Sequence, residues 1–110
     1  MTVAESVAEW LASVKADAMP AEAVETAQKL FLDVAGLCVA ARHERYVTAT
    51  WSATDAGMTT DTVPGGRCTV LGHAGGCDGF GAALVNGTAA HGEDYDDTFE
   101  GGPVHSGAVI

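Results

Sequence analysis

Basic residues are scarce in this chain, where five lysines and arginines face fifteen aspartates and glutamates, for a formal net charge of −10. An acidic surface repels nucleic-acid phosphates and anionic membranes, so we expect neither as a partner. No apolar run approaches the ~18 residues needed to span a bilayer. The N-terminus also lacks the basic start and apolar run of a secretory signal. We therefore expect a soluble, cytoplasmic protein.

Cysteines and aromatic residues are also few. Cys38, Cys68 and Cys77 are odd in number and show no C-x-x-C spacing, which argues against a disulfide framework and against a zinc site. Aromatic residues make up only 6% of the chain, whereas glycine occurs 14 times. The 110 residues therefore fit one ordered domain with a modest core in which backbones pack closely.

Local signals predict four helices joined by glycine-rich connectors. Thr2 and Glu5 fit a capping box, and Pro20 suits the first turn of a second helix. A connector around 68–71 could be a short strand, and 59–66 and 72–76 are expected to be loop. Apolar periodicity places the helices at about residues 3–15, 20–41, 46–56 and 77–92.

The second and fourth predicted helices are unusual. From Val34 to Ala41 no side chain is charged or polar, so we expect burial on all sides in a body larger than this chain. The apolar run 108–110 likewise leads us to expect that the chain is cut inside an element. Gly79, Gly81 and Gly87 predict close helix packing in the fourth helix, because glycine otherwise costs roughly 1 kcal/mol there.

The most informative stretch is His91–Gly107, HGEDYDDTFEGGPVHSG, which contains no lysine or arginine. Its carboxylates would all be ionised at neutral pH, so crowding them together is electrostatically unfavourable. A functional site is the leading explanation for this crowding. The carboxylates are Glu93, Asp94, Asp96, Asp97 and Glu100.

If the fourth helix continues through this stretch, His91, Asp94 and Thr98 share one face, and Asp97 lies beside Asp94. Glu93 and Asp96 would then point elsewhere. The turn 101–103 would bring His105 back toward Asp94, where an imidazole can take or give a proton.

Three alternatives remain on spacing alone. The stretch could be a solvated acidic helix end, a calcium or magnesium site, or a proton-transfer site. The D-x-D-x-D-G loop of calcium sites is absent and imidazole is a poor calcium ligand, so no metal is predicted.

At the level of whole motifs, the run NGTAAHGEDYDDTFEGGPVHSGAVI (86–110) resembles the signature region of the MmgE/PrpD family. The segments PAEAVETAQKLFLDVAGLCVAA and CTVLGHAG are similar to that family's N-terminal portion. The resemblance implies a 2-methylcitrate dehydratase, cis-aconitate decarboxylase or iminodisuccinate epimerase type of enzyme. Such enzymes are cofactor-independent homodimers that act on small di- or tricarboxylic acids, with a helical domain and a smaller α+β domain.

Carried over by motif, the resemblance implies catalytic roles for Asp94, Thr98 and His105, with His91 and Asp97 as substrate-binding candidates. Ser106 departs from the pattern, since many members have proline there.

Family members are several times longer, so we expect residues 1–110 to be an all-α, partial helical domain that is inactive alone. A multiply charged acid needs cationic partners, and no lysine or arginine follows Arg67 in this chain. The alternative hypothesis is a non-enzymatic acidic helical module that binds a partner or a divalent cation.

Overall fold

A computed structural model gives the fold, and it describes residues 1–57 and 68–109. The described residues form four α-helices and a two-stranded sheet, which confirms the expected helical class. The elements are α1 (Val3–Ser13), η1 (Ala16–Ala18), α2 (Ala21–Ala41), α3 (Arg45–Gly57), β1 (Cys68–Thr69), β2 (Gly76–Cys77), α4 (Gly79–His91) and η2 (Gly107–Val109), where η marks a 3-10 turn.

Local signals place the helix boundaries nearly as expected. The Thr2 hydroxyl accepts from the Glu5 amide at 3.3 Å, and the Glu5 carboxylate accepts from the Thr2 amide at 2.7 Å, so the predicted capping box is present. Helix α1 ends earlier than predicted because Val14 adopts an extended backbone. Pro20 is the N-cap of α2, one position before the first turn.

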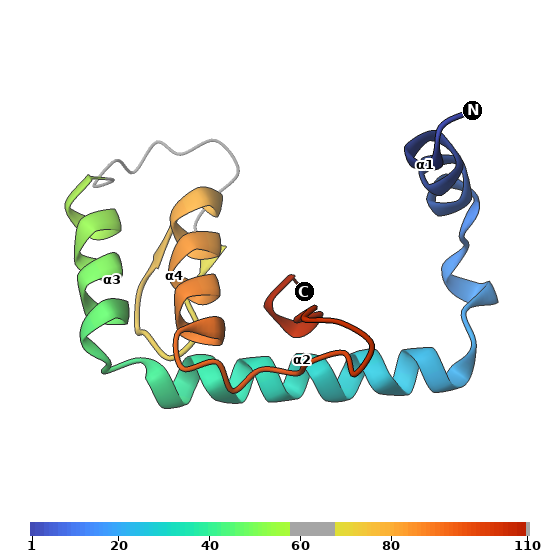
Figure 1. The fold of residues 1–110 in the computed structure, drawn as a ribbon. Helices are drawn as coiled ribbons and strands as arrows, with labels where there is room; N and C mark the ends of the chain where they lie inside the picture. Colours follow the sequence, from blue (N-terminus) through green and yellow to red (C-terminus); the bar gives the residue numbers. More distant parts are fainter. Residues whose placement is uncertain (58–67, 110) are drawn as a thin grey trace.

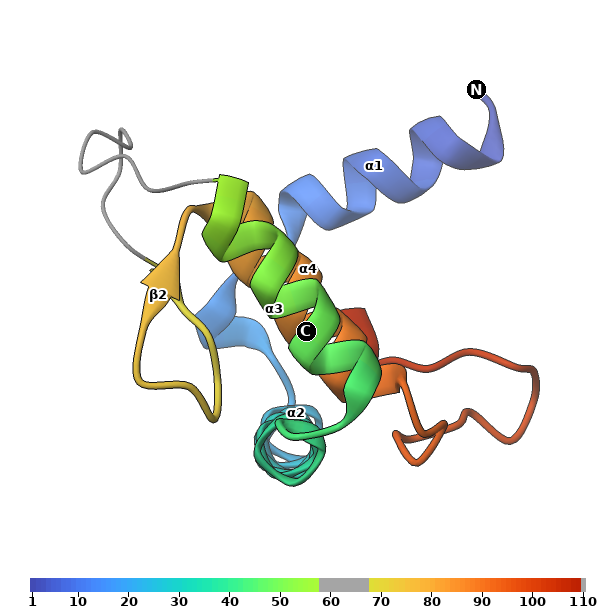
Figure 2. The ribbon, with the colours of Figure 1, turned by 90° about the vertical axis from the view of Figure 1, so that its left-hand side faces the viewer.

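Helix α4 lies at the centre of the packed half of the molecule. Helices α3 and α4 run side by side in opposite directions across one end of α2 (Figure 1). Seen along α2, the hairpin of β1 and β2 and the acidic loop after α4 lie on opposite sides of this helix pair (Figure 2). The core consists of small side chains, as the composition suggested: Cys38, Ala41, Val47, Val70, Cys77, Ala82, Val85, Ala89 and Ala90.

The glycines of α4 do not all serve helix packing. A Cβ at Gly81 would lie 2.9 Å from Cys77 Sγ and 3.4 Å from Thr54 Cβ, so the predicted close approach is confirmed there. A Cβ at Gly87 would meet nothing within 4 Å, so the prediction is wrong at that position.

The connector before α4 forms a small antiparallel hairpin in which Cys68 pairs with Cys77 and Thr69 with Gly76. The predicted strand is therefore confirmed, although Gly76 belongs to β2 and not to a loop. Asn86 of α4 holds this connector: its Oδ1 accepts from the Leu71 amide at 2.9 Å, and its Nδ2 donates to the Thr69 carbonyl at 3.1 Å. The predicted loop 59–66 and Arg67 lie outside the described residues.

Helix α2 is covered on one side only. Cys38 and Ala41 are buried against α4, whereas Val39 stays 44% exposed, so burial on all sides is not achieved within the described residues. Helix α1 buries no residue at all and stands apart at the far end of α2 (Figure 1). The radius of gyration of 16.6 Å exceeds the ~13 Å of a compact domain of this length.

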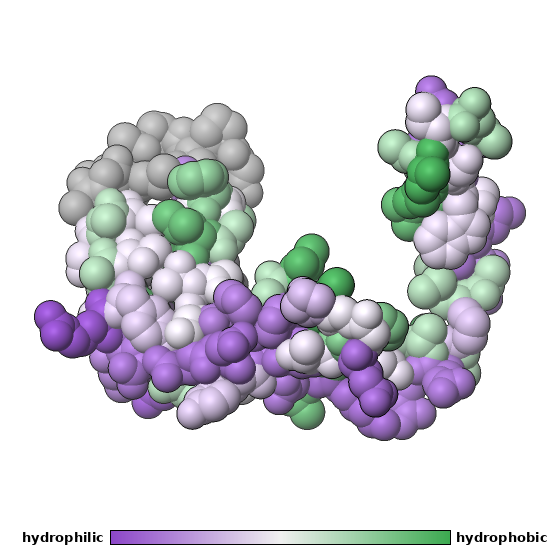
Figure 3. All heavy atoms as spheres, in the orientation of Figure 1, coloured by the Kyte–Doolittle hydropathy of each residue, from purple (hydrophilic) through white to green (hydrophobic). Residues whose placement is uncertain are grey.

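Hydrophobic residues are exposed on α1, on α4 and around the C-terminal turn (Figure 3). Even so, no helix among the described residues has the length and apolarity required to cross a membrane.

Candidate active site

The acidic stretch begins where α4 ends, at His91. The helix therefore does not continue through it, and the expected face of His91, Asp94 and Thr98 at helical spacing is wrong. Gly92 lies so close beneath the Tyr46 ring of α3 that a Cβ there would collide with it. Two residues later Asp94 adopts φ of 57°, the left-handed conformation that turns the chain away from the helix axis.

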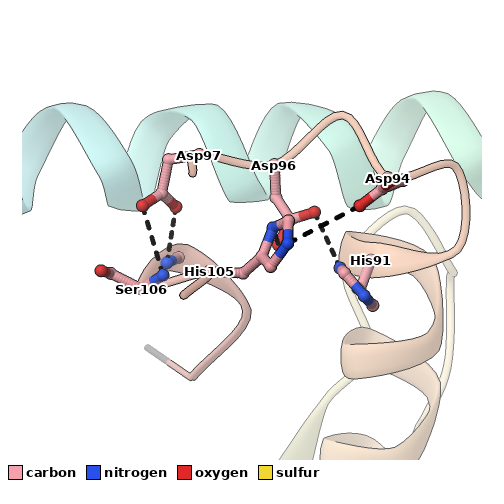
Figure 4. A network of polar contacts seen from close by, with 7 residues as sticks. His91, Asp94, Asp96, Asp97, His105 and Ser106 are labelled. Carbon is pink, nitrogen blue, oxygen red and sulfur yellow. Dashed lines mark hydrogen bonds and ion pairs between the residues drawn. The ribbon is translucent and has the colours of Figure 1, made fainter. Parts of the chain in front are cut away.

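The folded loop nevertheless brings most of the predicted site residues close to one another. His105 Nε2 lies 3.8 Å from Asp94 Oδ1, and His105 Nδ1 lies 3.4 Å from Asp96 Oδ2. His91 Nδ1 lies 2.9 Å from Asp96 Oδ1, and the two imidazole rings meet edge-on at 4.7 Å. Figure 4 shows the His105 ring and the Asp96 carboxylate at the centre of the cluster, with dashed contacts running to Asp94 and to His91.

Asp96, expected to point elsewhere, is the centre of the cluster. Its side chain is 0% exposed, whereas that of Asp94 is 76% exposed and that of His91 51%. The helical period assumed from the sequence separated Asp94 from Asp96.

A tight turn carries His105 back to the cluster, as predicted. The Phe99 amide donates to the Val104 carbonyl at 2.9 Å, and the Gly102 amide donates to the Phe99 carbonyl at 3.0 Å. The turn therefore closes across the residues between Phe99 and Val104.

Asp97 fastens the returning segment. Its Oδ1 accepts from the Gly107 amide at 2.6 Å and its Oδ2 from the Ser106 amide at 3.2 Å (Figure 4). A Cβ at Gly107 would collide with Asp97 and come within 2.7 Å of Val34, so only glycine fits there. Asp97 thus holds in place the residues that follow His105.

The carboxylates and imidazoles of the cluster stabilise one another's charged forms. The hydrogen bond and charge of Asp96 raise the pKa of His91 above its ordinary 6.5. Burial alone would raise the pKa of Asp96, but its hydrogen bond to His91, a backbone hydrogen bond and the charges of both histidines lower it below 3.8. The pair is therefore most favourable with Asp96 ionised and His91 protonated.

Beside the cluster, a second polar contact ties the start of the loop to α3. The Tyr46 hydroxyl donates to Glu93 at 2.8 Å. Burial, this hydrogen bond and the nearby charges of Glu93 and Glu44 raise the pKa of Tyr46 to about 12. Tyr46 therefore stays a neutral donor throughout the physiological range.

One predicted member, Thr98, does not join the cluster, and no lysine or arginine pairs with the cluster among the described residues. Thr98 is exposed, and no polar contact of the described residues joins it to the histidines. Lys29, for example, pairs with Glu25 at 2.7 Å. The ion pairs of the described residues therefore bring no lysine or arginine to the cluster to bind a carboxylate.

The donor set would also suit a metal ion. His91, Asp94, Asp96 and His105 can each offer one ligand atom, all within 4.8 Å of one another. Two imidazoles among carboxylates are typical of zinc, iron or manganese and not of calcium. This differs from the calcium or magnesium alternative expected from the acidic stretch.

An apolar cavity of about 280 Å³ lies between α2, α4 and η2, beside the loop that carries His105. Phe31, Val34, Cys38 and Gly87 are among the residues that line it, and none of the four cluster residues does. The open space next to Gly87 is part of this cavity.

Comparison with known proteins agrees with the motif resemblance. The model of the MmgE/PrpD N-terminal domain matches residues 5–110. The chain is 28% identical over 119 residues to a cis-aconitate decarboxylase-like protein, oryM, of Aspergillus oryzae, covering 100% of this chain and 24% of that protein. It is 29% identical over 112 residues to a cis-aconitate decarboxylase of Aspergillus terreus, covering 98% of this chain and 21% of that protein.

No solved structure matches the chain significantly. The chain spans about a quarter or less of the length of the curated relatives it matches. Because the family model covers nearly the whole chain, this protein belongs to the MmgE/PrpD family and corresponds to its N-terminal domain.

Proposed function

We propose that this chain supplies the N-terminal part of the helical domain of an MmgE/PrpD-type lyase or isomerase, which needs no cofactor. Its substrate is a small di- or tricarboxylic acid, and its chemistry removes or returns a proton at a carbon beside a carboxylate. The family match and the name cis-aconitate decarboxylase carried by a relative support this class of substrate.

The observation that carries the proposal is the position of His105 between two carboxylates, 3.8 Å from Asp94 and 3.4 Å from Asp96. An imidazole titrates near neutral pH and can act as base and then as acid. We assign proton transfer to His105. Asp94 is exposed and lies beside Nε2, on the side from which a substrate would approach. Its carboxylate can share the proton with His105 or orient the substrate acid.

Thr98, His91 and Asp97 complete the proposed site in different ways. Thr98 binds a substrate carboxylate once the loop closes over the acid. His91, half exposed and favoured in its protonated form by Asp96, supplies a positive charge for a second carboxylate. Asp97 was expected to bind substrate, but both its oxygens already accept backbone amides, which favours a positioning role.

The remaining cationic groups come from outside the described residues in this proposal. Arg67 is one candidate in the chain, and the rest belong to segments that this chain does not contain. The exposed apolar surfaces of α1 and α2 fit packing against those further segments. We propose that the complete enzyme is a cytoplasmic homodimer.

The test measures turnover of cis-aconitate, 2-methylcitrate and iminodisuccinate by the purified chain, alone and mixed with the rest of the polypeptide as a second chain. We expect no turnover by the chain alone and restored turnover in the mixture. His105→Gln should then lower kcat by about 10²- to 10⁴-fold, as is usual for loss of a general acid or base. Turnover by the chain alone would contradict its expected inactivity, and unchanged kcat in His105→Gln would contradict the assigned role.

A second candidate function is a module that holds a divalent cation. The grouping of four donor atoms within 4.8 Å favours it. Calorimetry with zinc, manganese, calcium and magnesium separates the two functions. Tight binding that Asp96→Asn abolishes would favour the cation module, and absence of heat with all four ions would remove it.

A further inference from the structure

Asp96 is the one member of the cluster to which the motif resemblance assigns no role. Burying an ionised carboxylate is costly unless it is paired and hydrogen-bonded. Asp96 is 4% exposed, and the exposed Asp94 nearby shows that the loop has room for solvated carboxylates. A buried carboxylate here therefore requires an explanation beyond the acidity of the stretch.

The two oxygens of Asp96 face different imidazoles. Oδ1 lies 2.9 Å from His91 Nδ1 at hydrogen-bond distance. Oδ2 and His105 Nδ1 are both buried and have no hydrogen-bond partner, yet they lie only 3.4 Å apart. A donor and an acceptor left unpaired this close together satisfy each other with a small adjustment.

The arrangement also separates the two nitrogens of His105. Nδ1 faces the buried Asp96, and Nε2 faces the exposed Asp94 at 3.8 Å. A carboxylate can only accept when ionised, so Asp96 favours a proton on Nδ1 and thereby leaves the lone pair on Nε2. A buried carboxylate that fixes the tautomer of a catalytic histidine is known from serine proteases.

Given the proposed function, we propose that Asp96 is the positioning residue of His105, holding the Nδ1–H tautomer so that Nε2 is the atom that takes the proton. When Nε2 accepts a proton from the substrate carbon, the imidazolium is stabilised by the Asp96 carboxylate. The bonding pair stays on the carbanion, and the same proton leaves from Nε2 in the return step. His91 holds the other oxygen of Asp96 and so keeps Oδ2 directed at His105.

The experiment records long-range ¹⁵N–¹H spectra of the ¹⁵N-labelled chain, without added metal, at a pH where His105 is neutral. The ¹⁵N shifts identify which ring nitrogen carries the proton. We expect the wild-type chain to carry it on Nδ1 of His105. Asp96→Asn should move it to Nε2, because an amide can donate to Nδ1.

Asp94→Asn is the matched control, since it makes the same change of carboxylate to amide on the other side of the ring. We expect the Nδ1–H tautomer to persist in this variant. A wild-type tautomer with the proton on Nε2, or an unchanged tautomer in folded Asp96→Asn, would overturn the proposal. If Asp96→Asn does not fold, the wild-type and Asp94→Asn spectra decide.

The tautomer measurement and the turnover measurement test the role of Asp96 and the proposed function separately. Turnover that depends on His105 together with a wild-type Nε2–H tautomer would keep the proposed function and remove the role of Asp96. The Nδ1–H tautomer in a chain whose reconstituted enzyme turns over none of the three acids would keep the orienting contact and overturn the proposed function.

Discussion

At the scale of single residues, Asp94 combines an unusual backbone with a candidate catalytic side chain. It is the one non-glycine residue with positive φ among those the structure describes, and this conformation costs most residues about 1–2 kcal/mol. Aspartate and asparagine tolerate it better because their short polar side chains bond locally. The turn places the Asp94 carboxylate beside His105, so local strain and site geometry coincide.

Substitutions at Asp94 should therefore distinguish the effect of its backbone conformation on stability from the effect of its charge. We expect Asp94→Asn to change the free energy of unfolding by less than about 0.5 kcal/mol and Asp94→Ala to lower it by about 1 kcal/mol more, because alanine lacks the local tolerance. Urea denaturation measures both values. Glu100→Ala, an exposed carboxylate with ordinary φ, is the control and should be nearly neutral. Equal stability of Asp94→Asn and Asp94→Ala would argue against backbone strain.

The pair of His91 and Asp96 predicts a pH dependence at the same scale. Because the folded pKa of His91 is raised, its stabilising contribution is complete below pH 6.5 and is lost as pH rises through the folded pKa. Because the folded pKa of Asp96 is lowered, its contribution is complete above 3.8 and is lost as pH falls through that lower pKa.

An NMR titration of the His91 ring protons checks this prediction. We expect a midpoint above 6.5 that falls in Asp96→Asn and stays in Glu100→Gln. A His91 midpoint that does not respond to Asp96→Asn would show that the contact does not persist in solution.

At the scale of elements, α4 organises the packed half because it is built of small residues. Gly81, Ala82 and Ala89 let α3, the hairpin and α2 approach its backbone. Asn86 fixes the connector through both ends of its side-chain amide, and its backbone carbonyl accepts a hydrogen bond from the Cys38 thiol at 3.4 Å. His91 is the last residue of α4, and the cluster begins there.

Two glycines of this helix, Gly81 and Gly87, should respond to alanine in opposite ways. Gly87→Ala should raise the free energy of unfolding by up to about 1 kcal/mol, since its Cβ meets nothing and alanine favours helix. Gly81→Ala should lower it by about 1–3 kcal/mol, because its Cβ would crowd Cys77 and Thr54. Chemical denaturation of both variants tests this, and a loss at Gly87 as large as that at Gly81 would contradict it.

At the scale of the whole molecule, the described residues leave apolar surface exposed on two helices. Trp10 and Leu11 of α1 are 64% and 58% exposed, and Leu32 of α2 is 74% exposed. Exposed apolar side chains of this size are typical of interaction surfaces. The extended shape and the apolar cavity beside η2 agree with a domain that packs against further structure.

The isolated chain should therefore associate. We expect a light-scattering mass above the 11.2 kDa of one chain, rising with concentration. The double substitution of Trp10→Gln and Leu32→Gln leaves the net charge unchanged and should lower that mass. Glu9→Gln, on the same helix as Trp10, should leave the mass unchanged. A mass of one chain at all concentrations would contradict this expectation.

The sequence alone was sufficient for the helices and for the family. Capping at Thr2, Pro20 and the apolar periodicity are local signals, and helix formation depends on contacts within a few residues. The motif around Asp94 and His105 predicted a site in this region, and the structure brings these two side chains to within 3.8 Å of each other. The functional roles themselves stay predictions until turnover is measured.

Tertiary structure decided how that region is arranged. Helix α4 stops at His91, where Gly92 fits beneath Tyr46, and the chain turns at Asp94. Helical periodicity from the sequence therefore assigned the carboxylates to wrong faces and overlooked Asp96. The burial of Asp96 between two imidazoles depends on His105, which returns from nine residues further along the chain, and local sequence patterns carry no information on such contacts.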